Sequence, residues 1–183
     1  MGTSLLIFAI GIVVLWVVLI YNNLVRERNR TASAWSDIDV QLQRRHDLIP
    51  RLVEAVRAYA QYERATLETV TELRARSEQT RQVARIALLE QQIENGLRRL
   101  VALAEDYPDL KADRNFLELQ RELTDVEDQL QYARRYYNGA VRVFNTRIQS
   151  LPDLLVARPL GFAEAEFFDA APEAEAPVKV SLA

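Results

Sequence analysis

The stretch "FLELQRELTDVEDQLQYARRYYNGAVRVFNTRIQSL" (residues 116–151) decides the fold class. Its apolar positions recur at steps of three or four residues, which places them on one face of an α-helix and comes close to a heptad repeat. Proline follows directly at position 152, and a helix rarely continues into the residue before a proline. The stretch therefore predicts one long helix with a single buried face, formed by Phe116, Leu119, Leu123, Val126, Leu130, Ala133, Tyr137, Val141, Phe144, Ile148 and Leu151.

Two earlier runs show the same helical spacing, one over residues 38–70 and one over residues 83–104. The segment "EDYPDLKAD" (residues 105–113) separates the second run from the last, and its proline and aspartates are typical of a turn. No useful stretch of the body alternates with the period of a β-strand. The sequence predicts an all-α fold, an antiparallel helical bundle of three to four long helices over residues 26–151. The number depends on whether the first helix is kinked or broken near Pro50.

The segment "SLLIFAIGIVVLWVVLIYNNLV" (residues 4–25) carries no charge. As a helix it is about 31 Å long from Leu5 onward, close to the thickness of a hydrocarbon core. Trp16 and Tyr21 lie toward one end, where aromatic rings favour the membrane interface. A cleaved signal peptide is the alternative, but "MGTS" lacks a basic side chain and no small-residue cleavage site follows. We predict a retained transmembrane anchor over residues 1–25, with Leu5, Ile10, Val14, Trp16 and Tyr21 in contact with lipid.

Three arginines, Arg26, Arg28 and Arg30, follow the apolar segment at once, opposed only by Glu27. Basic residues beside a span favour the cytoplasmic side. We therefore expect a single-pass protein with its N-terminus outside and its bundle in the cytoplasm.

Composition excludes several kinds of site. The chain has 183 residues and no cysteine, so disulfides, thiolate catalysis and cysteine-bound metals are absent. Its net charge of -3 gives no reason to expect nucleic acid as a partner. The glycine patterns that cradle phosphates are also missing. We expect no cofactor.

The last 32 residues, 152–183, differ from the body because they carry six acidic and two basic side chains. They predict an acidic, partly flexible tail. "LGF" (residues 160–162) and "FF" (residues 167–168) are too apolar for a pure linker, and either fold back or dock on another chain. Residues 178–182 alternate and fit a strand added to a partner's sheet.

His46 is the only histidine, and it lies beside Asp47 and shortly before Pro50. A helical-bundle metal site uses Glu-x-x-His, but Gln43 stands where that glutamate would be. No glycine-rich oxyanion loop or nucleophile turn surrounds the serines nearby. We interpret His46, Asp47 and Pro50 as a joint where the first helix bends or breaks, with a pH-sensitive contact as the minor alternative.

Polar residues on the first and last helices suggest how these helices pair. If the last helix returns beside the first, the numbers of facing residues sum to about 172. Arg44, Arg45 and His46 then approach Val126, Glu127 and Asp128. The other expected inter-helix polar contacts place the aspartates opposite the arginines and the asparagines along the seam, and they involve Asn22, Asn29, Asp37, Asp39, Arg134, Arg135, Asn138 and Asn145.

Two blocks, "YNNLVRERNRTASAWSDIDVQLQRRHDLIPRLVEAVRAYAQYE" (residues 21–63) and "YPDLKADRNFLELQRELTDVEDQLQYARRYYNGAVRVFNTRIQSLP" (residues 107–152), resemble the signature regions of the bacterial LemA family. The later "LGF" and "FF" do so too. The resemblance implies a small protein of the bacterial cytoplasmic (inner) membrane with one N-terminal span and a helical bundle. It implies no established enzymatic activity, and some relatives are associated with magnetosome membranes.

The functional prediction follows from the anchor, the heptad-like seam and the lack of a catalytic constellation. We expect a self-associating helical scaffold, a homo-oligomer in the bilayer, that organises protein partners or membrane. The alternative is an adaptor or regulator in envelope stress or membrane-protein quality control, with an unknown partner docking on the tail. A hydrolase or metal site centred on His46 is the remote alternative.

Overall fold

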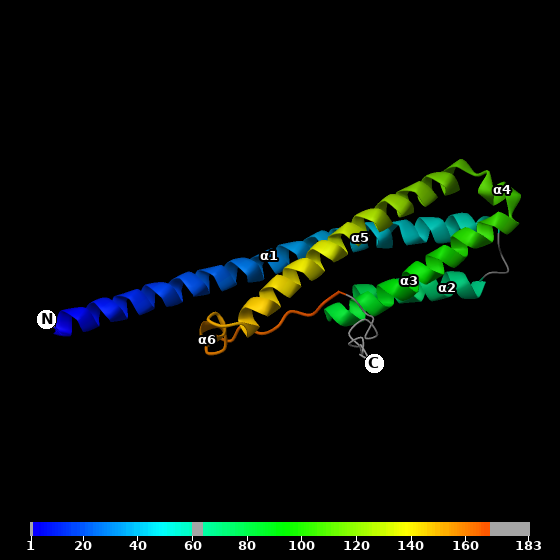
Figure 1. Cartoon of the computed structure of the whole chain (residues 1–183). Helices are drawn as coiled ribbons and strands as arrows, with labels where there is room; N and C mark the ends of the chain where they lie inside the picture. Colours follow the sequence, from blue (N-terminus) through cyan, green and yellow to red (C-terminus); the bar gives the residue numbers. More distant parts are fainter. Residues whose placement is uncertain (1, 60–63, 169–183) are drawn as a thin grey trace, which may run out of the picture. The chain divides into compact units, whose positions relative to one another are not determined.

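The computed structural model describes residues 2–59 and 64–168. Its helices are α1 (Gly2–Tyr59), α2 (Arg64–Glu78), α3 (Val83–Leu103), α4 (Pro108–Lys111), α5 (Arg114–Gln149) and α6 (Leu154–Ala157), with a 3-10 turn at Ala104–Asp106 (Figure 1). The described part of the chain contains no strand, so the predicted all-α class is confirmed. The third periodic run became α5, which begins after Asp113 and ends three residues before Pro152.

Helix α1 continues through Pro50 for nine residues, so the alternative of a break at this proline is wrong. The proline ring is exposed, whereas Ile49, Leu52 and Val56 on the other face are completely buried. Burying three such side chains stabilises the helix by roughly 1.5–3 kcal/mol each, which exceeds the cost of about 3 kcal/mol for an internal proline. The first periodic run instead divides between α1 and α2, after Tyr59.

The chain divides into two compact units, each of them helical. Among the described residues, unit 1 comprises 2–45 and 124–166, and unit 2 comprises 46–59, 64–123 and 167–168. One boundary between the units falls inside α1 and another falls inside α5, so each of these two helices contributes to both units.

In unit 1, α1 and α5 pair in antiparallel fashion. The ring centroids of Trp35 and Tyr137 lie 5.5 Å apart, and Arg147 Nη1 lies 3.9 Å from Glu27 Oε1. These residue numbers sum to 172 and 174, which is the register expected from the sequence. The apolar core at one end of the unit consists of Ile20, Leu24, Phe144, Ile148, Val156 and Ala157.

The chain after α5 folds back in unit 1, so the tail predicted from residue 152 begins later. Phe162 packs on the core of unit 1, and the Tyr137 hydroxyl donates a hydrogen bond to the Glu166 carbonyl at 2.8 Å. Gly161 has a φ of +72°, a left-handed conformation that glycine adopts without strain. Of the two alternatives for "LGF", folding back is the one observed. The predicted strand at residues 178–182 lies outside the described residues.

In unit 2, the end of α1, the hairpin of α2 and α3, α4 and the start of α5 surround a larger core. Asp113 caps α5, because its Oδ1 accepts a hydrogen bond from the Phe116 amide at 3.0 Å. The core contains Ile49, Leu52, Val53, Val56, Leu67, Val70, Leu73, Leu89, Ile93, Leu97, Leu100, Ala104, Leu110 and Phe116.

Candidate functional site

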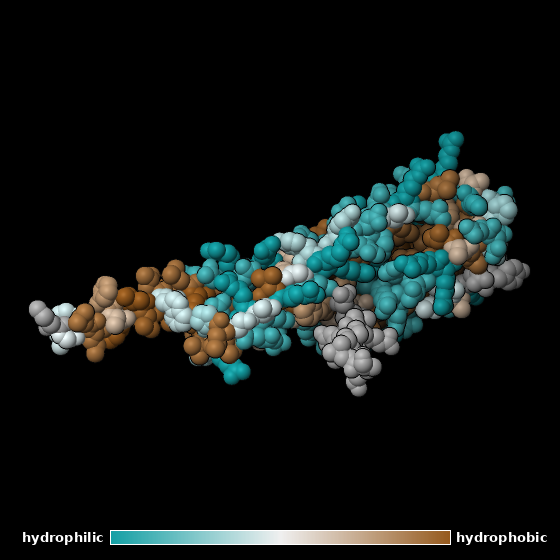
Figure 2. Space-filling model, viewed as in Figure 1, coloured by the Kyte–Doolittle hydropathy of each residue, from teal (hydrophilic) through white to brown (hydrophobic). Residues whose placement is uncertain are grey.

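The N-terminal part of α1 exposes an apolar surface that the rest of the described chain does not cover. The exposed fractions are 69% for Leu5, 55% for Ile10 and 56% for Val14, and Trp16 and Tyr21 are also exposed. Figure 2 shows that most of the surface along the start of α1 is hydrophobic. The helix is long and apolar enough to cross a membrane. A surface of this kind in water marks a membrane or protein contact.

The three arginines after the apolar segment are exposed. Arg28 lies over the ring of Phe162, 5.5 Å from its centroid. Arg30 Nε donates a hydrogen bond to the Tyr136 hydroxyl at 3.3 Å, and this bond raises the pKa of Arg30 above its ordinary value. All three therefore present positive charge directly beyond the apolar stretch.

Arg45 is 1% exposed and forms an ion pair with Glu127 across the seam of α1 and α5. Their residue numbers sum to 172, the register expected from the sequence. Of the contacts that this register predicts for Arg44, Arg45 and His46, the one between Arg45 and Glu127 is formed, whereas His46 Nε2 lies 2.7 Å from Glu90 Oε1.

The other expected charge contact is not formed. Arg135 is exposed, and its guanidinium lies over the ring of Tyr132 on its own helix, 4.8 Å from the centroid. Within residues 2–59 and 64–168, no ion pair joins Arg135 to Asp37 or Asp39, both of which are exposed. The long side chain of Arg135 instead stacks one turn back along α5. Arg134 is partly buried on the same helix.

The asparagines divide between surface and interior. Asn22 and Asn29 are exposed on α1. Asn138 is partly buried, and Asn145 is buried. The Asn145 amide exchanges two hydrogen bonds of 2.9 Å with the backbone of Ala165, so it fixes the returning chain rather than α1.

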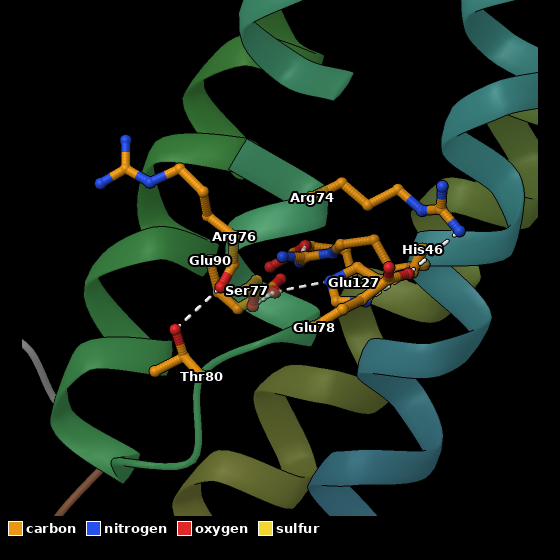
Figure 3. A network of polar contacts seen from close by, with 9 residues as sticks. His46, Arg74, Arg76, Ser77, Glu78, Thr80, Glu90 and Glu127 are labelled. Atoms are coloured by element: carbon orange, nitrogen blue, oxygen red, sulfur yellow. Dashed lines mark hydrogen bonds and ion pairs between the residues drawn. The ribbon is translucent and has the colours of Figure 1, made fainter. Parts of the chain in front are cut away.

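His46 belongs to a polar cluster in unit 2 that we call the Glu90 cluster (His46, Ser77, Glu78 and Glu90; Figure 3), in which Glu78 is exposed and the other three are buried. Glu90 of α3 is completely buried, and its Oε1 accepts hydrogen bonds from Ser77 Oγ at 2.6 Å and His46 Nε2 at 2.7 Å. His46 Nδ1 lies 3.7 Å from Glu78 Oε1, which also pairs with Arg74 at 3.0 Å. Thus a carboxylate that would be costly to bury alone has two hydrogen-bond partners.

The geometry of the Glu90 cluster does not match nucleophilic catalysis. In such a site the hydroxyl faces the imidazole, which takes its proton. Here both Ser77 and His46 bind the same oxygen of Glu90. Ser36, which lies near His46 in the sequence, donates its hydroxyl to the Ala32 carbonyl of its own helix. Within the described residues, no group of histidines and acids is arranged to hold a metal ion.

Sequence reasoning missed Glu90 and Ser77. The signal that could have found Glu90 is its position on the apolar stripe of α3, four residues after Ile86 and three before Ile93. The interpretation of His46 as part of a joint also changes, since the structure places it against α2 and α3, while Asp47 is exposed. The cluster holds together three helices of unit 2.

Comparison with known proteins gives one family and several relatives. A sequence model of a protein family, described as the LemA family, matches residues 34–182. The chain is 28% identical over 154 residues to protein LemA of Metamycoplasma hominis, covering 81% of this chain and 68% of the relative. It is 24% identical over 184 residues to magnetosome protein MamQ 2 of Paramagnetospirillum magneticum, covering 86% and 68%. Magnetosome protein MamQ of Magnetospirillum gryphiswaldense is 29% identical over 84 residues, covering 46% and 31%.

Proposed function

Because the chain belongs to the LemA family, we propose that it is a membrane-anchored helical scaffold that self-associates and organises protein partners or membrane, without catalytic activity. The observation that carries the proposal is the exposed apolar part of α1, which is continuous with the helix that builds both compact units. The names of the magnetosome relatives give a place rather than a reaction, which is consistent with an organising role.

The proposed orientation puts the N-terminus outside the bacterial cytoplasmic membrane and both units in the cytoplasm. It is supported by Arg26, Arg28 and Arg30, which remain exposed directly beyond the apolar segment. A span with no charge on its N-terminal side and three arginines on the other has a clear asymmetry.

The buried contact of His46 with Glu90 supports a structural role for this histidine in the proposed scaffold. The hydrogen bonds of the Glu90 cluster link α1, α2 and α3, and all three partners of the central hydrogen bonds are buried. A strain that carries His46→Ala should keep any activity assigned to the protein when that activity is expressed per amount of protein. Total activity should fall only as far as the amount of protein falls. Loss of an activity at unchanged abundance would favour the enzyme alternative.

Self-association can be tested by disulfide cross-linking, because the natural chain has no cysteine. Single cysteines placed in turn over residues 5–19 of α1 would be oxidised in native membranes at native expression. We expect dimers that rise and fall with the helical period, since only one face of each anchor contacts the next copy. Leu88→Cys, on an exposed position of α3, is the control for random collision. Monomer at every position would refute self-association of the anchors.

The adaptor alternative makes a different prediction for the tail. Partners would be captured by pull-down from detergent-solubilised membranes with the full chain and with a chain that ends at Phe168. A scaffold that works through its helices retains its partners when residues 169–183 are removed, whereas an adaptor that reads partners through its tail loses them.

A further inference from the structure

A second exposed apolar surface lies around α6. Leu151, Leu155 and Leu160 are 71%, 64% and 53% exposed, although leucine is usually buried in a folded domain. Figure 2 shows hydrophobic side chains gathered where α6 lies, at the end of α5. Three leucines projecting from one ten-residue segment form a patch rather than isolated surface residues. We call residues 151–160 the leucine loop.

The other face of the leucine loop packs against the end of the apolar segment of α1. Val156 and Ala157 are buried in the same core as Ile20 and Leu24, and Val17 packs against that core. The loop is therefore held beside residues 17–24 of α1 within unit 1.

The length of the apolar segment fixes the depth of this contact. A helix needs about 20 residues to cross a hydrocarbon core of about 30 Å. Counted from Leu5, twenty residues end at Leu24. The part of α1 from Leu5 to Trp16 that has no packed core around it spans only about 18 Å. A full crossing must include the residues that the leucine loop covers, so the loop lies at bilayer depth.

The backbone of the leucine loop is suited to that environment. Most backbone amides in and directly after the leucine loop donate hydrogen bonds to carbonyls between Ser150 and Arg158. These amides belong to Leu154, Leu155, Val156, Ala157, Arg158, Gly161 and Phe162. An irregular segment with unsatisfied amides would be excluded from the apolar edge of a bilayer. This internal pairing removes most of that cost.

The charges near the loop are also compatible with a membrane edge. Arg147 Nε forms an ion pair with Asp153 Oδ2 at 3.1 Å, and Arg147 Nη1 lies 3.9 Å from Glu27 Oε1. Arg158 is exposed, and its long side chain can extend its charged end to the lipid headgroups.

We infer that the leucine loop is a second membrane contact, which inserts Leu151, Leu155 and Leu160 among the acyl chains beside the end of the span near Tyr21. The occupant of the patch is the lipid bilayer, because the patch is continuous in depth with the apolar surface of α1. The inference rests on the proposed function, since it requires α1 to cross the membrane.

Spin labels at single cysteines in the full chain test the inference. The protein would be reconstituted in vesicles of phosphatidylethanolamine and phosphatidylglycerol, with labels at Ile10→Cys, Leu155→Cys and Tyr132→Cys. Collision with oxygen, which concentrates in lipid, would be compared with collision with a water-soluble nickel chelate. Tyr132 is 62% exposed on α5 and serves as the control for the aqueous surface of unit 1. Circular dichroism would establish that each variant keeps its helical content.

We expect the labels at positions 10 and 155 to favour oxygen over nickel and the label at position 132 to favour nickel. A lipid signal at position 10 with an aqueous signal at position 155 overturns the leucine loop inference alone. Spin–spin broadening at position 155, with both collision partners excluded, also overturns it, because a second copy then covers the patch. An aqueous signal at position 10 overturns the proposed anchor and the inference together.

Discussion

Arg45 is the largest side chain among those the described fold buries completely, and its charge is satisfied by Glu127 across the seam. Removing one member of a buried ion pair leaves the other charge without its partner. We predict that Arg45→Ala lowers the free energy of unfolding by about 3 kcal/mol, the low end for such pairs because Glu127 is 26% exposed. The midpoint of helix loss on heating or in urea measures the change.

The neighbouring arginine gives a matched control for this prediction. Arg44 is exposed and donates a hydrogen bond to Gln41 on the same helix, at 3.3 Å. Arg44→Ala should change stability by no more than about 0.5 kcal/mol. If the two variants unfold at the same midpoint, the Arg45–Glu127 pair does not stabilise the contact of α1 with α5.

Tyr137 links stability to alkaline pH. Burial, and then the charge of Glu166, raise the pKa of the Tyr137 hydroxyl above its ordinary value. An unfolded tyrosine loses its proton at about pH 10, so above this pH the folded chain holds a proton that the unfolded chain has lost. We predict that the contribution of Tyr137 to the free energy of unfolding is fully present below about pH 10 and falls as the pH rises through and beyond this value.

The Tyr137→Phe variant removes this contribution. It should unfold about 1 kcal/mol more easily at neutral pH, because the hydrogen bond to the Glu166 carbonyl is lost. Its stability should then decline less than that of the natural chain at alkaline pH. Tyr132→Phe, which removes an exposed hydroxyl, should leave the alkaline decline unchanged. An equal decline in all three proteins would show that Tyr137 is not its source.

At the scale of elements, two glycines in long helices have opposite surroundings. A Cβ on Gly96 of α3 would lie 2.5 Å from Val70 Cγ2 of α2, whereas a Cβ on Gly139 of α5 would meet nothing within 4 Å. Gly96→Ala should therefore destabilise the α2–α3 hairpin by about 1–3 kcal/mol, despite its better helix propensity. Gly139→Ala should stabilise the protein by up to about 1 kcal/mol. Both changes are read from thermal unfolding.

A double-mutant cycle separates the clash from other effects at Gly96. In a Val70→Ala background the neighbouring side chain is shorter, so Gly96→Ala should lose most of its penalty. If the penalty persists in that background, the close approach of α2 and α3 at this point is not its cause.

The helices could be predicted from the sequence because their periodicity reports a buried face directly. The register of α1 against α5 could also be predicted, because pairing Leu151, at the end of the last helix, with Tyr21, near the end of the apolar segment, fixes which residues meet, as at Arg45 and Glu127. The end of α1 could not be predicted from the sequence. The cost of Pro50 is visible in the local sequence, whereas the burial of Leu52 and Val56, which offsets that cost, depends on other helices. The Glu90 cluster was missed for the same reason, because its partners come from three separate segments.

At the scale of the whole molecule, the same physical property, exposed apolar surface, explains both the anchor and the leucine loop. The apolar start of α1 and the exposed leucines of the leucine loop both lie in unit 1. Arg26 and Arg28 come directly after the apolar segment of α1, and both are exposed. A span anchored by lipid at its start and by a folded core at its end has one stable depth. Its orientation then depends on the charge on either side.

Orientation can be measured by labelling single cysteines in intact cells with a membrane-impermeant maleimide. We predict that Thr3→Cys reacts from outside and that Leu88→Cys reacts only after the membrane is opened. Leu88 is 47% exposed, so a cysteine at this position can be reached by the reagent. The physical reason is that the start of the chain carries no basic side chain, whereas three arginines follow the apolar segment. Labelling of position 88 in intact cells, with position 3 protected, would place the two units outside.

The arginines themselves can be tested for this role. Replacing Arg26, Arg28 and Arg30 with glutamine should make position 88 accessible in a substantial fraction of molecules, because the charge difference on which the proposed orientation depends is lost. The matched control changes three exposed arginines of α3, Arg85, Arg98 and Arg99, to glutamine. It lowers the net charge by the same amount but lies far along the chain from the span, so orientation should not change. Equal inversion by both triple variants would mean that total charge, rather than charge beside the span, sets the topology.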